Sequence, residues 1–500
     1  MKIHSIFKLN DGLALITGAA LTLSFAPYQF YPLAIICPAI LLALWLNISK
    51  KRAFFRGWLF GLGLFGAGVY WIFISIHTFG DISSFVSIII TGGLIAILAL
   101  FPGIGGYLFN RYFFRVTPCN LLFAFPAIWV ALEWIRTWVF TGFPWFMLGY
   151  SQINSPLSGY AALFGVFGVS LAVLLSSALL VQFIIYLRQK NYRDSIFTLA
   201  VGFMIWIVGG CLTQITWTKP FGPPIKVSLV QGNIPQEMKW SPEHLQFTLN
   251  QYSKLSANHW DSRIVIWPES AIPLPLQEAE NFLEALDTTA KKQGAAFITG
   301  IPVQLPTSES YYNAVIVLGN GHGFYLKHRL VPFGEYIPLR DFLHTALDLL
   351  HVPMSDFVPS VARAKPLEVG NLKISAFICY EIAFPELVIS SDPTINLLLT
   401  VSNDAWFGHS IAQVQHLEMA RMRAIEMGRP VLFVSNNGIT AIIKADGKIQ
   451  SAAPPFQTYV LTDKVQPTAG KTPWQLWGMD PVLLTIVIFI LIAMRKRRDN

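Results

Sequence analysis

Three ionisable residues in the second half of the chain each follow a short apolar stretch that is typical of a buried strand. Glu269 ends the stretch RIVIWPE, Lys327 ends FYLK and Cys379 ends ISAFIC. Catalytic groups in α/β folds collect at the carboxyl ends of strands, so these side chains could meet in one site. Singly they are weak candidates, because a charged residue after a strand is usually solvated and a lone cysteine is usually a small buried apolar residue.

Together, the three residues form a complete set for acyl transfer through cysteine. A neutral thiol is a poor nucleophile, and a nearby carboxylate can take its proton as a general base. An ammonium group can then stabilise the oxyanion of the tetrahedral intermediate. A helical turn that begins at Cys379 would add backbone amides, which would lower the pKa of the thiol.

The residues from about 220 to 470 have the pattern of an α/β domain. Apolar runs separated by amphipathic helices indicate sheets covered on their faces, and we expect two sheets stacked between helices. The helix expected at 412–428 is interpreted as a charged structural face with a pair between Arg423 and Glu426. The expected strands are 225–231, 262–268, 295–303, 312–318, 322–328, 372–379, 395–402, 430–436 and 440–445, and the other expected helices are 242–260 and 278–294.

The rest of the chain has the composition of a membrane protein. Only 13% of the residues are charged and 53% are hydrophobic, whereas soluble proteins average about 25% charged residues. Windows of about 20 apolar residues are long enough to cross a bilayer. We expect an α-helical bundle of eight transmembrane helices, near 11–28, 30–47, 57–77, 84–109, 120–140, 160–187, 195–215 and 474–494.

Lys/Arg placement predicts the orientation of these helices. The basic segments, such as SKKRAFFR and RKRR, all fall on one side of the predicted membrane, so both termini are expected to be cytoplasmic. The predicted domains are transmembrane helices in 1–219, an extracytoplasmic catalytic domain in 220–470, and a last transmembrane helix with a basic tail in 471–500. The net charge of +8 follows from the basic segments and does not indicate nucleic-acid binding.

The other cysteines lie away from the extracytoplasmic domain. Cys37 and Cys211 are inside predicted spans, and Cys119 lies at the cytoplasmic start of another. Cys379 therefore has no cysteine partner within its domain, although that compartment would permit disulfides.

Six sequence motifs resemble those of the nitrilase superfamily, and in particular its membrane-bound branch, the apolipoprotein N-acyltransferases. Three of them hold the Glu, Lys and Cys in the family's chain order, and the resemblance covers essentially the whole chain. The motifs are WPESAIP (267–273), YLKHRLVPFGEYIP (325–338), CYEIAFPE (379–386), QGNIPQEMKW (231–240), TGFPW (141–145) and SNDAWFG (402–408). The resemblance implies a nitrilase-like αββα sandwich joined to eight transmembrane helices.

The resemblance also implies roles for individual residues. Glu269 would be the general base, Lys327 would stabilise the tetrahedral intermediate and Cys379 would be acylated. Glu335 would orient Lys327 and shuttle a proton. Residues expected to support the active site are Tyr380 and Glu381, and residues expected near the substrate entrance are Trp240, Trp406 and Trp145.

Some of these residues have an equally good structural interpretation. Trp240 and Trp406 could be interfacial anchors, because indole favours the headgroup region. Glu133 and Arg136, three residues apart in the fifth span, could line the floor of the active site or form a structural ion pair. The apolar segment 339–354 could be a lid lying on the membrane or an ordinary core helix.

In the family, the reaction has two steps and needs no cofactor or metal. The cysteine takes a fatty acyl chain from a phospholipid, typically phosphatidylethanolamine. The thioester then acylates the α-amine of the S-diacylglyceryl-cysteine of an apolipoprotein, the final step of bacterial lipoprotein maturation. The resemblance thus implies a monomeric enzyme of the bacterial inner membrane with a periplasmic catalytic domain, membrane lipid as a partner and no nucleic acid.

Two other functions fit parts of the sequence. A membrane-tethered amidase or nitrilase would use the same triad but transfer the acyl group to water. A transporter with an accessory domain is the second alternative. Few charged positions inside the spans, and no obvious inverted repeat, argue against the transporter.

Overall fold

The computed structural model describes residues 2–80, 82–306, 310–332, 334–336 and 356–498. The chain forms two compact units. One comprises Met1–Phe73, Ser84–Thr216 and Leu476–Asn500, and the other comprises Ile74–Ser83 and Trp217–Gln475.

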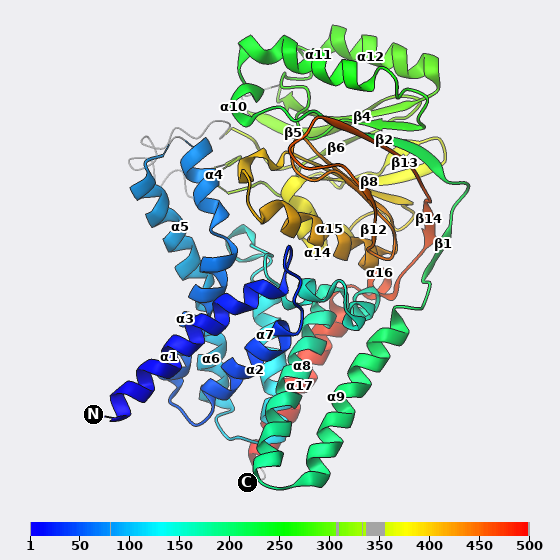
Figure 1. Cartoon of the computed structure of the whole chain (residues 1–500). Coiled ribbons are helices and arrows are strands. Elements are labelled where there is room, and N and C mark those ends of the chain that lie inside the picture. Colours follow the sequence, from blue (N-terminus) through cyan, green and yellow to red (C-terminus); the bar gives the residue numbers. More distant parts are fainter. Residues whose placement is uncertain (1, 81, 307–309, 333, 337–355, 499–500) are drawn as a thin grey trace. The chain divides into compact units, whose positions relative to one another are not determined.

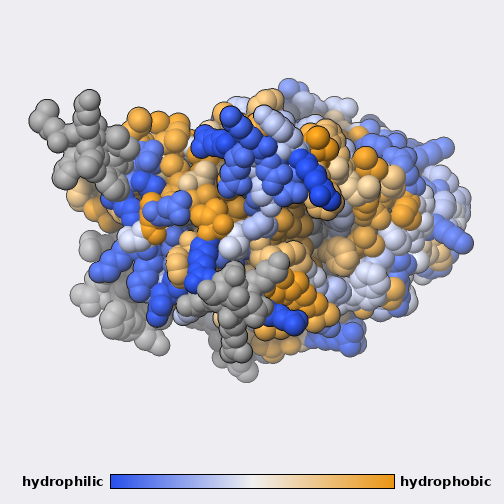
Figure 2. All heavy atoms as spheres, turned by 90° about the horizontal axis from the view of Figure 1, so that it is seen from below, coloured by the Kyte–Doolittle hydropathy of each residue, from blue (hydrophilic) through white to orange (hydrophobic). Residues whose placement is uncertain are grey.

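The first unit is a helical bundle (Figure 1). Its principal helices are α1 (Lys2–Leu21), α2 (Leu33–Trp45), α3 (Lys50–Gly68), α5 (Ser84–Leu98), α6 (Leu100–Tyr112), α7 (Phe125–Ile135), α8 (Ala161–Arg188), α9 (Tyr192–Leu212) and α17 (Asp480–Arg498), and α4 (Trp71–Phe79) passes from this unit into the other. Large apolar side chains are exposed along α5 and α9, including Phe85, Ile88, Phe197 and Phe203. Seen from below, hydrophilic side chains gather over the middle of the visible face, among hydrophobic ones (Figure 2).

Fewer helices than the predicted eight meet the length and hydropathy expected of a membrane span. Within the described residues, three do so: Ser84–Tyr112, Pro156–Arg188 and Tyr192–Leu212. A fourth is obtained if Lys50–Gly68 and Trp71–Phe79, which are bent by 53° relative to each other, count as one span. The bend interrupts the span expected at 57–77, because Val69 leaves helical geometry (φ −118°, ψ 21°). The remaining spans stay predictions.

The second unit is a four-layer sandwich of two six-stranded sheets between helices. The first sheet has the order β13-β2-β3-β4-β5-β6 and the second has the order β12-β11-β10-β9-β8-β7. The strands of the first sheet are β2 (Ile225–Gln231), β3 (Ile264–Ile266), β4 (Ala296–Gln304), β5 (Tyr311–Gly319), β6 (Phe324–Leu326) and β13 (Tyr459–Val465). Those of the second are β7 (Leu367–Val369), β8 (Leu372–Ile378), β9 (Leu397–Ser402), β10 (Val431–Ser435), β11 (Ala441–Ile443) and β12 (Ile449–Ala452).

Both faces of the central strands, such as β3, β9 and β10, are buried, as their near-continuous apolar sequences require. Alternate residues such as Leu229 and Ile266 of one sheet and Leu399 of the other fill the space between the sheets. The intervening residues of the first sheet pack beneath α11 (Leu245–Ser256) and α12 (Glu280–Gln293). The opposite sheet carries α14 (Pro385–Ile389) and α15 (Ala412–Met427).

Helix α15 differs from the charged surface helix expected at 412–428. Arg423 and Glu426 do form an ion pair, with Nε and Oε2 3.0 Å apart, but both side chains are fully buried. Most of the helix is covered, including His416 and Glu418. A run of charged residues indicates the helix but not its burial, because buried ion pairs and solvated ones have the same spacing.

The strand directions bring the predicted catalytic residues to one edge of the sandwich. Strands β2, β3 and β4 are parallel, and β6 runs in the same direction because it is antiparallel to β5, which is antiparallel to β4. In the other sheet, β8, β9 and β10 are parallel. The residues that follow β3, β6, β8 and β9 therefore lie at carboxyl ends, where α/β folds place their sites.

We expect the apolar packing between the two sheets to contribute most of the stability of this unit. Replacing Leu399, which is fully buried on β9, with alanine should lower the free energy of unfolding by about 2–5 kcal/mol. Ile449→Ala on β12 is the control, because Ile449 is 43% exposed and should change it by less than about 1 kcal/mol. Denaturant unfolding followed by tryptophan fluorescence in detergent would measure both, and equal losses would contradict this core assignment.

Candidate active site

A buried lysine between two carboxylates forms the centre of the candidate site. Lys327, directly after β6, has its side chain only 1% exposed. Its Nζ lies 2.8 Å from Oε1 of Glu335 and 3.3 Å from Oε1 of Glu269. Glu269 follows β3, and both carboxylates are themselves almost covered. Lys327 is thus in direct contact with both Glu269 and Glu335.

Burial alone would favour the neutral form of Lys327, but its surroundings act in the other direction. The charges of Glu269 and Glu335 outweigh the desolvation of the ammonium group and raise the pKa of Lys327 above its ordinary value. The lysine therefore stays cationic at neutral pH and can stabilise negative charge near it.

Asn313, on β5, completes this centre and was not predicted from the sequence. Its Nδ2 donates to Oε1 of Glu269 at 2.8 Å and to Oε1 of Glu335 at 2.9 Å. Two carboxylates this close would repel each other, so Asn313 and Lys327 together hold them in place. The sequence did contain a signal for it, because Asn313 is the one amide side chain within the apolar strand YYNAVIVL.

Further backbone donors fix the two carboxylates. The N–H of Asn403, after β9, donates to Oε2 of Glu269 at 2.9 Å, and the N–H of Val331 donates to Oε2 of Glu335 at 2.9 Å. Each oxygen of both groups thus has a donor, as a buried carboxylate requires. The carboxylate of Glu269 is thereby linked to both sheets.

Cys379 lies at a sharp turn between β8 and the short 3₁₀ helix Cys379–Ala383. Its φ of 52° lies in the left-handed region, which residues with a side chain rarely adopt. The residue is 9% exposed. Strain of this kind persists only where the surrounding structure holds the backbone in place.

The pKa of the Cys379 thiol is raised, whereas the sequence suggested that it would be lowered. Burial is the largest cause, and the negative charge of Glu269 adds to it, while Lys327 and a hydrogen bond with Ser402 act in the lowering direction. The resting thiol is therefore protonated at neutral pH. A base must remove its proton during attack, and Glu269 is the carboxylate whose charge acts on it most strongly.

Glu381 connects the turn at Cys379 to the segment that carries Lys327. Its Oε1 accepts from the N–H groups of His328 and Arg329 at 2.7 and 3.0 Å, and its Oε2 accepts from the hydroxyl of Tyr325 and the N–H of Ile378, both at 2.8 Å. Burial raises the pKa of this carboxyl group, and Lys327 and these backbone donors oppose the shift. The contacts identify Glu381 as a structural clamp between the two segments.

Tyr380 is buried beside Cys379 and packs against Phe384, with ring centroids 4.9 Å apart and an angle of 79° between the rings. Tyr380 and Glu381 thus lie in the same 3₁₀ helix as Cys379, whereas Glu335 contacts Lys327.

Lys239 is a second buried lysine next to the triad and was also missed. It ends the short helix α10 (Gln236–Lys239), is 4% exposed, and donates from Nζ to the main-chain oxygen of Glu269 at 2.9 Å. Burial lowers the pKa of Lys239 to about 8, although the charges of Glu269 and Cys379 oppose this. Nothing in the sequence distinguishes Lys239 from a solvated lysine. The adjacent Trp240 was predicted as a site residue, but Lys239 was not.

The tryptophans predicted at the entrance differ in exposure. Trp240 and Trp406 are half-buried at the surface of the catalytic unit. Trp406 is held by the segment 74–83 of the same unit: Ser75 donates to its carbonyl oxygen at 2.7 Å, and the ring of Phe79 lies edge-on at 5.8 Å. These contacts anchor the short 3₁₀ helix Asp404–Phe407, which carries Trp406.

Trp145, Glu133 and Arg136 lie inside the helical unit. Trp145 is 2% exposed and stacks on Phe143 at 5.4 Å. Oε1 of Glu133 accepts from the N–H of Leu148 at 2.9 Å, and the guanidinium of Arg136 donates to the carbonyl oxygens of Trp145 and Phe146. Glu133 and Arg136 thus tie the chain after α7 to that helix.

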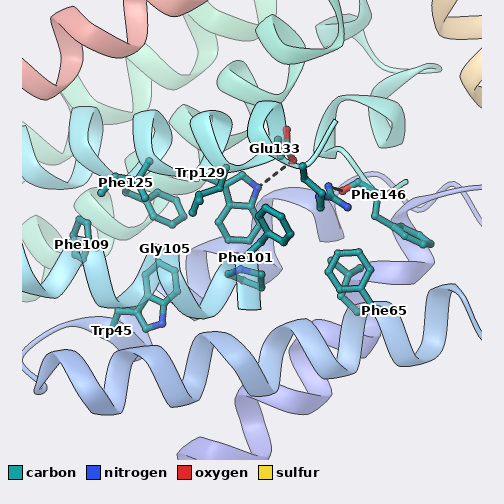
Figure 3. A pocket seen from close by; sticks show the side chains of 14 residues that line it. Trp45, Phe65, Phe101, Gly105, Phe109, Phe125, Trp129, Glu133 and Phe146 are labelled. Carbon is teal, nitrogen blue, oxygen red and sulfur yellow. Dashed lines mark hydrogen bonds between the residues drawn. The ribbon is translucent and has the colours of Figure 1, made fainter. Parts of the chain in front are cut away.

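Glu133 and Arg136 also border a narrow aromatic cavity of about 30 Å³ (Figure 3). Trp129 lies in its wall and donates to Oε1 of Glu133 at 3.1 Å. Phe65 lies beneath Arg136, with its ring centre 5.2 Å from the guanidinium carbon. A volume of this size holds about one or two water molecules. The apolar segment 339–354 lies outside the described residues.

The sandwich fold and its Glu–Lys–Cys edge define a protein with a carbon–nitrogen hydrolase domain. The carbon-nitrogen hydrolase family matches residues 226–473, and the apolipoprotein N-acyltransferase N-terminal domain matches residues 17–179. The yeast protein Nit3, a solved member of the nitrilase superfamily, is 17% identical with a TM-score of 0.37, covering 53% of this chain and 97% of that one.

Curated relatives extend the match over nearly the whole chain. The apolipoprotein N-acyltransferase of Coxiella burnetii is 43% identical over 97% of this chain and 100% of its own length. That of Methylococcus capsulatus is 40% identical over 98% of this chain and 96% of its own. The chain belongs to the apolipoprotein N-acyltransferase family and is an acyltransferase.

The lowered pKa of Lys239 predicts a specific pH dependence of stability. Its ordinary value is 10.5, so between pH 8 and 10.5 the unfolded chain binds a proton that the folded protein lacks, and stability rises with pH over that range. Lys239→Met should remove this contribution, so its unfolding midpoint in detergent should rise less between pH 8 and 10 than that of the wild type. Lys254→Met, at an exposed lysine of α11, is the control and should follow the wild type.

Proposed function

We propose that the protein transfers a fatty acyl chain from a phospholipid to the N-terminal α-amine of S-diacylglyceryl-cysteine on an apolipoprotein, through a thioester at Cys379. The observation that carries the proposal is the buried Lys327, paired with Glu269 and Glu335 at the strand edge where Cys379 lies. Membership of the apolipoprotein N-acyltransferase family supports the choice of acceptor.

In the first step, Sγ of Cys379 attacks the carbonyl carbon of a phospholipid ester while Glu269 takes the thiol proton. Lys327 stabilises the oxyanion that forms, and Glu335 keeps the ammonium group in position. The C–O bond then breaks, and Glu269 returns the proton to the leaving oxygen of the lysophospholipid. A thioester remains on the enzyme. Phosphatidylethanolamine is the proposed donor.

In the second step, the neutral α-amine of the acceptor attacks the thioester carbon and Glu269 accepts the amine's proton. The C–S bond breaks, the proton passes to the departing sulfur, and the products are an amide and the free thiol. The two steps share one base and one oxyanion-stabilising group, so a single centre serves a ping-pong mechanism.

Long apolar helices in the chain support a membrane setting for this chemistry. Removing an acyl chain from the bilayer costs about 0.8 kcal/mol per CH₂, and an enzyme held at the membrane avoids that cost. We propose a monomer in the bacterial inner membrane with both termini cytoplasmic, transmembrane helices in 1–219 and 471–500, and a periplasmic catalytic domain in 220–470. Trp240 and Trp406 are the proposed entrance residues.

The acyl-enzyme is directly testable. Intact mass measurement after exposure to phosphatidylethanolamine should show a fatty-acyl adduct that hydroxylamine removes and that Cys379→Ala abolishes. Glu269→Gln and Lys327→Met should each slow its formation by roughly 10²- to 10⁴-fold, since they remove the base and the oxyanion-stabilising charge. Substitution of Cys37, Cys119 or Cys211 is the control, and loss of the adduct in any of these would contradict the assignment.

The acceptor distinguishes the transferase from a hydrolase with the same triad. Without an amine acceptor, we expect about one lysophospholipid per enzyme and then arrest. Adding a diacylglyceryl peptide should restore steady release together with an N-acylated peptide. Steady release without any acceptor would show that water is the acyl acceptor and would overturn the proposal.

A further inference from the structure

A buried histidine on α15 contacts the backbone of the candidate nucleophile. His416 is 1% exposed, and its Nε2 lies 2.9 Å from the main-chain oxygen of Cys379. Its Nδ1 lies 3.2 Å from Oδ1 of the fully buried Asp404. The ring of Phe433 packs edge-on against the imidazole at 5.1 Å.

The chemistry of the acceptor determines the direction of the first hydrogen bond. A carbonyl oxygen can only accept, so Nε2 of His416 carries a hydrogen and donates it to Cys379. Asp404 is itself fixed, because its two oxygens accept from the hydroxyls of Ser402 at 2.6 Å and Ser435 at 3.2 Å. Hydrogen bonds to a carbonyl oxygen at Nε2 and to a carboxylate oxygen at Nδ1 together require a hydrogen on each nitrogen, so the ring held at both nitrogens and by Phe433 is the imidazolium form.

The contact acts on the strained part of the turn. The carbonyl of Cys379 and the N–H of Tyr380 share one planar peptide group, so a bond to the carbonyl fixes both. With φ at 52°, Cys379 would relax toward a more favourable conformation if that plane were released. The thiol would then move relative to Glu269 and Lys327.

We propose that His416 is a positioning residue, whose Nε2–H bond to the Cys379 carbonyl holds the nucleophile in its left-handed conformation for acyl transfer. Asp404 orients the imidazole so that Nε2 faces this carbonyl. The inference rests on the proposed function, because acyl transfer to Cys379 is the reaction that it serves.

Two substitutions of His416 separate this bond from general packing. His416→Gln keeps an N–H near the position of Nε2, whereas His416→Asn keeps only a polar group near Nδ1, facing Asp404. We expect His416→Asn to slow acyl-adduct formation from phosphatidylethanolamine by roughly 10- to 100-fold, the usual effect of a misplaced reacting group. His416→Gln should recover most of that loss, and the phospholipid KM should change little in either variant.

A second readout is independent of acyl transfer. The alkylation rate of Cys379 by iodoacetamide, followed by peptide mass, should rise several-fold in His416→Asn because the released turn exposes the thiol, and His416→Gln should stay nearer the wild type. His322→Asn, at an exposed histidine, is the control for both readouts. Unfolding midpoints of all variants give the stability comparison.

The outcomes separate the two proposals. A wild-type protein that forms no adduct contradicts the proposed function, while the alkylation rates still test His416. Equal adduct and alkylation rates in the Gln and Asn variants overturn the positioning role, as does a loss of rate that follows the unfolding midpoints alone.

Discussion

The neutralisation of one buried cation is the constraint on which the site depends. Lys327 is almost completely removed from water, and an unpaired ammonium group in that position would be strongly destabilising. Two carboxylates compensate it, and they come from different parts of the chain, after β3 and in the segment that follows Lys327. The fold must therefore bring these segments together before the lysine can be buried as a cation.

The same arrangement explains the state of the thiol. Lys327 favours the thiolate form of Cys379, but the burial of the thiol and the charge of Glu269 outweigh this effect, so the site does not favour a preformed thiolate. Burial and Glu269 both raise the pKa of Cys379. A protonated thiol must lose its proton during attack. The base Glu269 and the nucleophile Cys379 must therefore be held in fixed positions relative to each other.

The sequence predicted the strands well where a pattern existed, and it placed Glu269, Lys327 and Cys379 after strands, where the structure also has them. Strand β2 was predicted with the bounds observed, 225–231, because Ile225, Val227, Leu229 and Val230 form an apolar run bounded by Pro224 and Gly232. The strands β7, β12 and β13 were missed, since they are short or partly exposed and lack such a run. Spacing could not reveal the break at residue 69 in an expected span, because the flanking residues are as apolar as those of a continuous helix.

The remaining errors of prediction concern buried residues, because a local sequence pattern does not show whether a polar side chain is buried. Lys239 and Asn313 look like ordinary polar residues in the sequence, and only the packing of the strand edge makes them partners of Glu269. The expected lowering of the thiol pKa was wrong for the same reason: it considered the nearby amides and charges but not the removal of water. Charged residues on α15 were likewise assigned to the surface although they are covered.

The strained turn at Cys379 is held from two sides by different kinds of contact. Glu381 accepts three hydrogen bonds from the Lys327 segment and a fourth from the N–H of Ile378, and His416 contacts the Cys379 carbonyl from α15. A left-handed cysteine costs about 1–2 kcal/mol, which a single exposed contact would not offset reliably. Because both clamps are buried, each gives close to the full value of its hydrogen bonds. The nucleophile is thus held from two sides by buried contacts, whereas the proposed entrance residues Trp240 and Trp406 are only half-buried.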